Sequence, residues 1–351
     1  MNYQDIIRLL DQNAEYLLNY TCQKIKKDQI VIPSANHIDQ VFLDSNRNSH
    51  VLRNLSILYK SGRLGGTGYM SIFPVDQGVE HTASYSFYKN FQFFDPLKIV
   101  QFAIEAEMSA VASTLGVLAL VSRKYAHKIP FIVKINHNEL LTYPTKYDQH
   151  RFSTVQQAHE LGAIGIGATI YFGSQESNRQ IEEISFAFEQ AHRLGMFTIL
   201  WCYPRNDHFL VKDKDYSSAF DITSQANYLG VTLGADIIKQ KIPIAELGFR
   251  DLNFAKFSEE MYESIATPHP IDLVRSQVMN CYAGKISLIN SGGPSGENDF
   301  LDAVRTAVIN KRAGGSGLII GRKIFNSSFE EGIKIVEAIQ DVYLEEKVDI
   351  A

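Results

Sequence analysis

Eight short apolar segments recur along residues 70–322, and they limit the possible folds more than any other feature of the chain. They read MSIFPVD (70–76), SAVAST (109–114), FIVKIN (131–136), AIGIGAT (163–169), FTILWCY (197–203), ADIIKQK (235–241), ISLINS (286–291) and GLIIGR (317–322). Amphipathic stretches with helical spacing lie between them, for example residues 177–195 and 299–315. Near-continuous apolar runs are typical of parallel strands buried on both faces. Eight such strands close into a barrel, whereas about five or six usually form an open doubly wound sheet, so we predict an α/β chain with a (β/α)8 TIM barrel.

The remaining residues are predicted to pack around this barrel. Residues 1–65 carry helical patterning and are predicted to form an N-terminal helical extension. Residues 66–330 match the usual length of such a barrel, roughly 250 residues. Residues 331–351 are predicted to form a C-terminal helix and a tail that packs on the barrel.

Composition excludes several other classes of protein. The formal net charge of −5 gives no overall attraction to nucleic acid or to anionic membranes. No apolar run is long enough to span a bilayer, and the first residues lack the apolar core of a secretory signal. The three cysteines, Cys22, Cys202 and Cys281, lack the spacing of a disulfide framework or a zinc site. We therefore expect a cytoplasmic protein without nucleic-acid or membrane partners.

Polar and aromatic residues gather at the ends of the apolar segments, where barrels of this kind carry their chemistry. These residues are Asp76, Lys134, Asn136, Trp201, Tyr203, Lys239, Lys241, Ser291, Gly321 and Arg322. Because the bodies of the segments stay apolar, we expect the polar ends to meet in one site at the mouth of the barrel.

Lys239 and Lys241 close a buried strand, where a cation is costly unless it is solvated, paired or neutral. They are two residues apart, so both side chains can face inward and each can lower the pKa of the other. A neutral amine in a dry pocket attacks carbonyl carbons, and the resulting protonated imine withdraws electrons from the adjacent carbon. The alternative is a lysine that pairs with a carboxylate at the mouth, and this stretch alone leaves both interpretations open.

The loops after the last two segments predict an anion site. Gly292 and Gly293 follow Ser291 and let backbone amides approach a ligand, while Gly321 and Arg322 add amides and a guanidinium group. Phosphate bound after the seventh and eighth strands recurs in these barrels. Tight turns are the alternative interpretation, but the two loops together with Arg322 favour phosphate.

Three further strand-end residues are candidates for the chemistry. A phenol such as Tyr203 beside an amine can move protons, and the indole of Trp201 can form an apolar wall. Asp76 can take a hydroxyl proton or orient a substrate. The alternatives are core packing for the aromatic pair and a structural turn or cap for Asp76.

Several motifs occur in a characteristic order: PVDQGVEH, ATIYFGS, ILWCYPR, GADIIKQK, INSGGPSG and GLIIGRK, together with VLRNLSILYKSGRLGGTGY and HPIDLVRSQ. Together they resemble the archaeal-type class I fructose-bisphosphate aldolases, and most closely the bacterial branch with an N-terminal extension. The resemblance covers nearly the whole chain. It implies reversible cleavage of fructose 1,6-bisphosphate to dihydroxyacetone phosphate and glyceraldehyde 3-phosphate through a lysine Schiff base. It also implies a homo-oligomer that needs no metal and no cofactor.

The resemblance further implies a role for each matching residue. The imine falls on Lys239, acid/base catalysis on Tyr203, and a carboxylate that assists catalysis on Asp76. Gln77 departs from the family pattern, in which a histidine usually follows the aspartate, so the role of this position stays open. The residues predicted to bind the substrate are Trp201, His81, Lys241, Ser291, Gly292, Gly293, Gly321 and Arg322.

The sequence leaves three rival interpretations open. A related Schiff-base barrel enzyme would keep the lysine but act on another phosphorylated ketose or diketone. A metal-dependent aldolase would draw its ligands from His81, His127 and His137, although their spacing is not typical of a metal site. A phosphosugar-binding protein without catalysis would have no need for Lys239, Tyr203 and Asp76 together.

Overall fold

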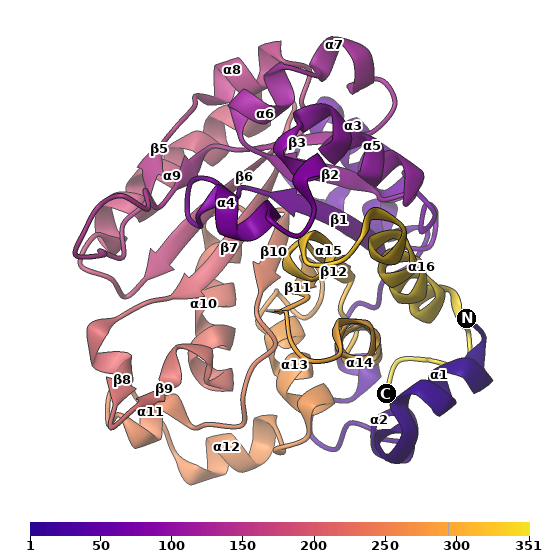
Figure 1. Cartoon of the computed structure of the whole chain (residues 1–351). Coiled ribbons are helices and arrows are strands. Elements are labelled where there is room, and N and C mark those ends of the chain that lie inside the picture. The colour runs from indigo at the N-terminus through magenta and orange to yellow at the C-terminus, as the bar shows by residue number, and fades with distance from the viewer. Residues whose placement is uncertain (294) are drawn as a thin grey trace.

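A closed barrel of eight parallel strands forms the centre of the computed structural model, which describes residues 1–293 and 295–351 (Figure 1). The strands are β1 (Met70–Val75), β2 (Ala110–Ser113), β3 (Phe131–Lys134), β6 (Gly165–Phe172), β7 (Phe197–Pro204), β10 (Ile237–Gln240), β11 (Ser287–Ser291) and β12 (Gly317–Ile319). The barrel closes where β12 pairs with β1, with Leu318 opposite Ser71. Each strand overlaps one of the eight predicted apolar segments, so the predicted (β/α)8 barrel is confirmed.

Helices between the strands form the outer layer of the barrel. They are α5 (Pro96–Glu105), α6 (Leu115–Ala119), α7 (Ser122–Tyr125), α8 (Val155–Glu160), α9 (Ser177–Arg193), α10 (Phe220–Thr232), α13 (Pro270–Met279), α14 (Asp299–Arg312) and α16 (Phe329–Leu344). Local sequence sets their starts: the Asp95 side chain caps α5 and Pro96 occupies its first turn. None of the helices in the described ranges is long and apolar enough to cross a membrane.

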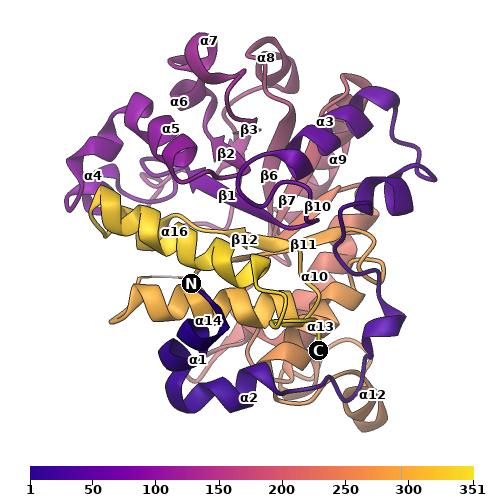
Figure 2. The ribbon, with the colours of Figure 1, turned by 90° about the vertical axis from the view of Figure 1, so that its right-hand side faces the viewer.

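The last helix, α16, packs beside α14 and takes the place of the eighth barrel helix (Figure 2). It begins at Phe329 and therefore runs across the predicted boundary between residues 330 and 331. The three-part division of the chain stays a prediction.

Short extra elements surround the C-terminal ends of the strands. They are α4 (Ala83–Phe87), η4 (Phe91–Phe94), β4 (Asn136–His137), β5 (His150–Arg151), η5 (Asp207–Phe209), β8 (Leu210–Val211), β9 (Lys214–Asp215), η6 (Tyr216–Ser218), α11 (Gly248–Asp251), α12 (Glu259–Ile265) and α15 (Arg322–Phe325). Two antiparallel hairpins, β4–β5 and β8–β9, are among them. These elements form a wall around the mouth of the barrel.

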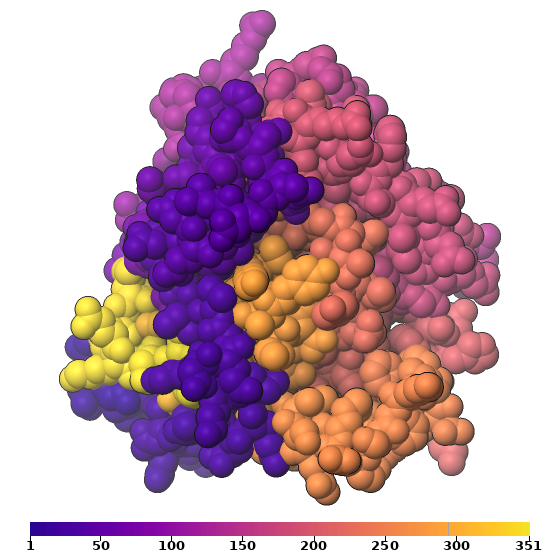
Figure 3. Space-filling view, turned by 180° about the vertical axis from the view of Figure 1, so that it is seen from behind, coloured from indigo at the N-terminus to yellow at the C-terminus, as the bar shows by residue number. Residues whose placement is uncertain are grey.

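The first residues of the chain lie outside the barrel, and residues 49–60 among them close its other end. Their elements are α1 (Tyr3–Leu10), η1 (Asp11–Asn13), α2 (Ala14–Leu18), η2 (Lys27–Gln29), η3 (Ile38–Phe42) and α3 (Ser49–Lys60). Leu55 and Leu58 of α3 are fully buried and pack in one apolar cluster with Ile199 and Ile237 from the barrel interior. The Asn54 amide donates to the carbonyl of Gly195, just before β7, at 2.8 Å. Figure 3 shows the N-terminal segment crossing the face opposite to that of Figure 1.

Arg275 of α13 is fully buried and ties distant segments together. Its guanidinium donates to the main-chain carbonyls of Ala313 at 2.6 Å, Ile25 at 2.8 Å, Ala351 at 2.7 Å and Arg312 at 3.3 Å. It thereby fastens the N-terminal segment to the end of α14. Backbone carbonyls buried without a donor are costly, so Arg275 is a position where a single change weakens the fold.

We expect Arg275→Met to lower the free energy of unfolding by about 3–5 kcal/mol, because several buried carbonyls lose a charged donor while the side-chain stem is kept. Urea unfolding followed by circular dichroism measures this difference. The control is Arg193→Met, which removes a guanidinium that is 78% exposed and is expected to change stability by less than about 0.5 kcal/mol. Equal effects of the two substitutions would contradict the assigned role of Arg275.

Candidate active site

A cavity of about 830 Å³ opens at the C-terminal ends of the strands. Its lining includes all eleven residues predicted to act in catalysis or substrate binding, namely Asp76, His81, Trp201, Tyr203, Lys239, Lys241, Ser291, Gly292, Gly293, Gly321 and Arg322. Lys134 of the predicted strand-end residues also lines it, but Asn136 does not, because its side chain is hydrogen-bonded to the main chain of Thr169. Pro294 lies outside the described residues. The structure therefore brings the predicted residues together in one place.

Lys239 lies on the inner face of β10, because strand residues alternate and Ile237 also faces the barrel interior. Its side chain is buried, and its Nζ lies 4.5 Å from the ring centre of Tyr203 and 5.9 Å from that of Trp201. Among the described residues, no carboxylate forms an ion pair with it. Burial, followed by the positive charge of Lys134, holds the pKa of Lys239 well below its usual range. A lowered pKa favours the neutral amine form of this lysine.

Lys241 also faces the cavity, so the prediction that both lysines point inward is correct. Burial and then the Arg205 guanidinium lower the pKa of Lys241 to about 8. Lys241 lowers the pKa of Lys239, as predicted, but Lys134 lowers it more strongly. Lys134 has the larger effect because it reaches the same part of the cavity from β3, with its Nζ 5.8 Å from the Trp201 ring.

Lys134 sits between two carboxylates that follow β1. Its Nζ lies 2.6 Å from Asp76 Oδ2 and 2.7 Å from Glu80 Oε1. Burial alone would raise the pKa of Asp76, but the Lys134 ammonium and then His137 hold it well below its usual range. Burial alone would lower the pKa of Lys134, but Asp76 and Glu80 raise it above its usual range. The pair is ionised, with Asp76 a carboxylate at the cavity wall.

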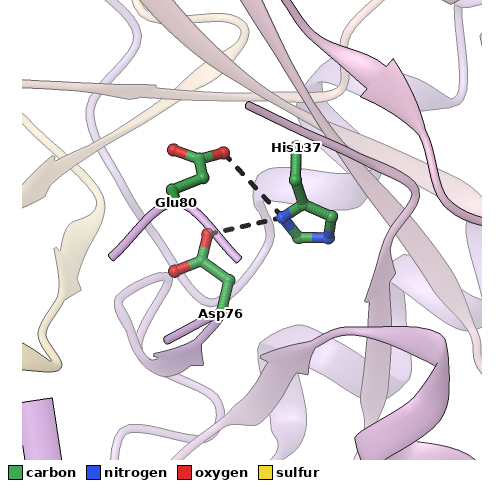
Figure 4. Close-up of side chains that lie close together, drawn as sticks. All are labelled: Asp76, Glu80 and His137. Carbon is green, nitrogen blue, oxygen red and sulfur yellow. Dashed lines mark ion pairs between the residues drawn. The ribbon is translucent and has the colours of Figure 1, made fainter. Parts of the chain in front are cut away.

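Asp76, Glu80 and His137 form the group that could supply metal ligands, since one atom from each lies within 4.8 Å of the others (Figure 4). His137 Nδ1 is 3.9 Å from Asp76 Oδ2 and 3.8 Å from Glu80 Oε1. Burial and then Lys134 lower the pKa of His137 to about 4, so the imidazole is neutral. The ammonium of Lys134 stands within hydrogen-bond distance of both carboxylates and supplies one positive charge to them.

The three histidines considered as a metal set are not brought together. His137 is buried, His81 is exposed at the rim of the cavity, and His127 is exposed ahead of β3, at the opposite end of the barrel. The spacing of these histidines in sequence did not predict their positions in space.

Two glycines of the loops after β11 and β12 lie where a side chain would clash with neighbouring atoms of the barrel. A Cβ on Gly292 would lie 2.9 Å from Ile320 Cγ1, and one on Gly321 would lie 2.7 Å from the carbonyl oxygen of Pro74. The amide of Gly292 donates to the Ile319 carbonyl at 3.1 Å, so it is not available to a ligand. Within the described ranges, the amides of Gly293 and Gly321 have no such acceptor. The arrangement favours these two amides and Arg322 as the anion donors.

Sequence reasoning missed a buried amide network that holds the end of β10. The Gln240 side chain accepts from the backbone amide of Lys241 at 2.8 Å and donates to Asn227 Oδ1 at 3.1 Å. The side chains of Gln277 and Asn290 both donate to the Lys241 carbonyl, at 3.0 and 3.4 Å. The sequence signal that could have predicted this network is Gln240, a polar residue at an outward-facing position of a buried strand. The network fixes the strand without adding charge near Lys239.

Glu80 and Arg205 also escaped prediction, although both lie inside motifs already singled out, PVDQGVEH and ILWCYPR. The sequence predicts Lys134 as a strand-end residue but does not predict its ion pairs with Asp76 and Glu80. Gln77, the departure from the family pattern, lines the cavity, and its Oε1 has no hydrogen-bond donor among the described residues.

A (β/α)8 barrel with a buried lysine at its mouth defines a class of proteins suited to imine chemistry. Within that class, the sequence model of the DeoC/LacD family aldolases matches residues 70–327. The chain belongs to this family.

Similar proteins agree with this membership. The "Probable fructose-bisphosphate aldolase class 1" of Chlamydia trachomatis serovar D is 55% identical over 346 residues, covering 99% of each chain. A solved archaeal fructose-1,6-bisphosphate aldolase, with its catalytic lysine bound to the carbinolamine intermediate, has a TM-score of 0.65 at 23% identity and covers 83% of this chain and 99% of its own. The fructose-bisphosphate aldolase from Slackia heliotrinireducens has a TM-score of 0.68 at 22% identity over 92% of both chains. The family resemblance read from the sequence motifs is confirmed.

Proposed function

We propose that this protein is a class I fructose-bisphosphate aldolase. It cleaves fructose 1,6-bisphosphate reversibly to dihydroxyacetone phosphate and glyceraldehyde 3-phosphate through a Schiff base on Lys239. The observation that carries the proposal is the buried Lys239 amine, which has no carboxylate ion pair among the described residues and lies 4.5 Å from the Tyr203 ring centre. The names of the Chlamydia and archaeal relatives support the same substrate.

The reaction begins with the neutral amine of Lys239, which attacks the C2 carbonyl of the open-chain sugar. The carbinolamine loses water and becomes an iminium ion. The C4 hydroxyl then gives up its proton to Tyr203 or Asp76, the C3–C4 bond breaks, and the electron pair of that bond moves toward the iminium nitrogen, which leaves an enamine. Glyceraldehyde 3-phosphate leaves as the aldehyde. Protonation of C3 and addition of water release dihydroxyacetone phosphate and restore the amine.

Tyr203 and Asp76 assist these steps. The phenol of Tyr203 lies beside the Lys239 amine. It moves protons while the carbinolamine forms and while the carbinolamine loses water. Asp76, kept ionised by Lys134, accepts a hydrogen bond from a substrate hydroxyl and orients it. Trp201 forms the apolar wall beside the amine, and His81 stands at the rim.

The iminium ion is the electron sink, so the proposed reaction requires neither a metal nor an organic cofactor. The phosphate next to the ketone is proposed to bind at Ser291, Gly293, Gly321 and Arg322, with Gly292 beside them in the same loop.

The protein is proposed to act in the cytoplasm as a homo-oligomer. Large exposed aromatic side chains in α4, directly after it and in η4 support assembly, since exposed apolar patches commonly mark contact surfaces. They are Tyr85, Tyr88, Phe91 and Phe94. Light scattering distinguishes an oligomer from a monomer, and a monomeric mass would contradict the proposal.

Borohydride trapping with dihydroxyacetone phosphate tests the proposed function directly. Reduction turns an imine into a stable amine, so peptide mass mapping is expected to find the adduct on Lys239, both with and without EDTA. An adduct on Lys241 would keep the chemistry and move the nucleophile. No adduct despite bound ligand would favour a non-catalytic phosphosugar-binding protein, and loss of cleavage in EDTA would favour a metal-dependent reaction.

A further inference from the structure

Two carboxylates share one ammonium at the wall of the cavity. Asp76 and Glu80 lie on the loop after β1, both line the cavity, and both approach the Nζ of Lys134, at 2.6 and 2.7 Å. Lys134 is the only lysine or arginine of the described residues that forms an ion pair with either carboxylate. His137 faces the same two groups but is neutral, since burial and then Lys134 lower its pKa to about 4 (Figure 4). The second carboxylate therefore needs an explanation beyond simple pairing of Lys134.

The backbone around Glu80 holds its carboxylate in place. The amide of Gly78 donates to the carbonyl of His81 at 2.7 Å and closes a tight turn that contains Glu80. The amide of Asn138, just after β3 and β4, donates to Glu80 Oε1 at 3.4 Å, and this is the oxygen that Lys134 contacts. Glu80 is thereby fixed to the same end of the barrel wall that carries Lys134.

Asp76 cannot serve a substrate and also remain the sole partner of a buried ammonium. Lys134 is 3% exposed, and a buried cation that loses its partner is costly. Among the described residues no group donates to Asp76 Oδ1, so this oxygen can receive a substrate hydroxyl. If Asp76 takes the hydroxyl proton, it becomes neutral and its attraction to Lys134 falls. Glu80 keeps the ammonium paired during that change.

We propose that Glu80 is a positioning residue for cleavage of the C3–C4 bond: it holds the Lys134 ammonium and so frees Asp76 to take the proton of the C4 hydroxyl. The proposal rests on the proposed function and chooses Asp76 over Tyr203 as the acceptor of that proton. The hydroxyl proton moves to Asp76, the C3–C4 electron pair moves toward the iminium nitrogen, and Asp76 later returns the proton to water. Glu80 also aids this transfer by charge, since one oxygen of each carboxylate lies within 4.8 Å of the other and a neighbouring anion favours proton uptake.

Glu80→Gln tests the role, since glutamine keeps the size of the side chain and one acceptor oxygen but removes the charge. Lys134 then has Asp76 as its sole carboxylate, and kcat for cleavage of fructose 1,6-bisphosphate is expected to fall by about 10- to 100-fold, part of the effect of a positioned base. Dihydroxyacetone phosphate in D2O exchanges the hydrogen on the carbon that becomes C3 of the sugar. This exchange needs the imine and the enamine but no C4 hydroxyl, so its rate, measured by NMR, is expected to stay within about threefold.

Two further variants complete the test. Glu80→Asp restores the negative charge and is expected to recover most of the lost cleavage. Glu105→Gln is the matched control, because Glu105 is an exposed glutamate of α5 that does not line the cavity, and it is expected to change neither rate. Equal losses of cleavage and exchange in Glu80→Gln, or unchanged cleavage, would overturn the positioning role. Absence of cleavage and of a trapped adduct in the unmodified protein would overturn the proposed function instead.

Discussion

Replacing Lys239 by methionine is expected to abolish the borohydride-trapped adduct and to lower kcat for bisphosphate cleavage by at least about 10⁴-fold. Methionine fills the same space, so Trp201 and Tyr203 keep a neighbour of similar shape. What is lost is the amine that forms the covalent intermediate and serves as the electron sink. Adduct mass and steady-state cleavage, measured on the same preparation, check both parts of the prediction.

The informative comparison is Lys241→Met. This variant is expected to retain the adduct on Lys239, because the nucleophile and its low pKa depend first on burial and then on Lys134. If the adduct persisted in Lys239→Met and disappeared in Lys241→Met, the assignment of the nucleophile would be reversed. An intact circular dichroism spectrum in both variants excludes unfolding as the cause.

The second large effect is expected from Lys134→Met. Removing the ammonium takes away a charge that lowers the pKa of Lys239 and leaves Asp76, which raises it. The pKa of Lys239 therefore rises, less of the amine is neutral at a given pH, and the acidic limb of the rate of imine formation shifts upward by about one pH unit or more. Stopped-flow trapping of dihydroxyacetone phosphate between pH 5 and 9 measures the shift. A lower rate with the midpoint unmoved would refute an electrostatic role for Lys134.

The same variant is expected to be less stable by about 3–5 kcal/mol at neutral pH, because two mostly buried carboxylates lose their partner. The folded-state pKa of Asp76 is depressed, so its stabilisation is present above its unfolded pKa, about 3.9, and is lost as the pH falls through the folded value. The deficit should therefore shrink on acidification. Lys128→Met, at an exposed lysine ahead of β3, is the control for loss of a lysine outside the cavity.

The barrel could be predicted because its signal is local. Each strand is buried on both faces and reads as an apolar run, and the eight runs match the eight strands in order. The N-terminal segment was predicted to be helical, but its packing was not. Leu55 and Ile237 lie in one apolar cluster although they are about 180 positions apart in the sequence. Neither stretch of sequence contains a pattern that predicts this.

The site was predictable where the alternation of strand side chains decides the direction of a residue. Lys239, Lys241, Trp201 and Tyr203 all face the cavity for that reason. The pairing of Lys134 with Asp76 depends on contact between the end of β3 and the residue after β1. A local sequence pattern cannot predict such a contact. The consequence is that the residues could be named from sequence, but the origin of the low pKa of Lys239 could not.

The helix α3 at the far end of the barrel has a consequence for the lysine. Leu55 and Leu58 share one apolar cluster with Trp201, which borders the Lys239 amine. They extend the apolar packing of the barrel interior at the end away from the cavity. A low local dielectric lowers the pKa of a lysine. Apolar packing at the opposite end of the barrel therefore contributes to the low pKa of Lys239. The N-terminal segment thus belongs to the electrostatic environment of Lys239 although none of its residues lines the cavity.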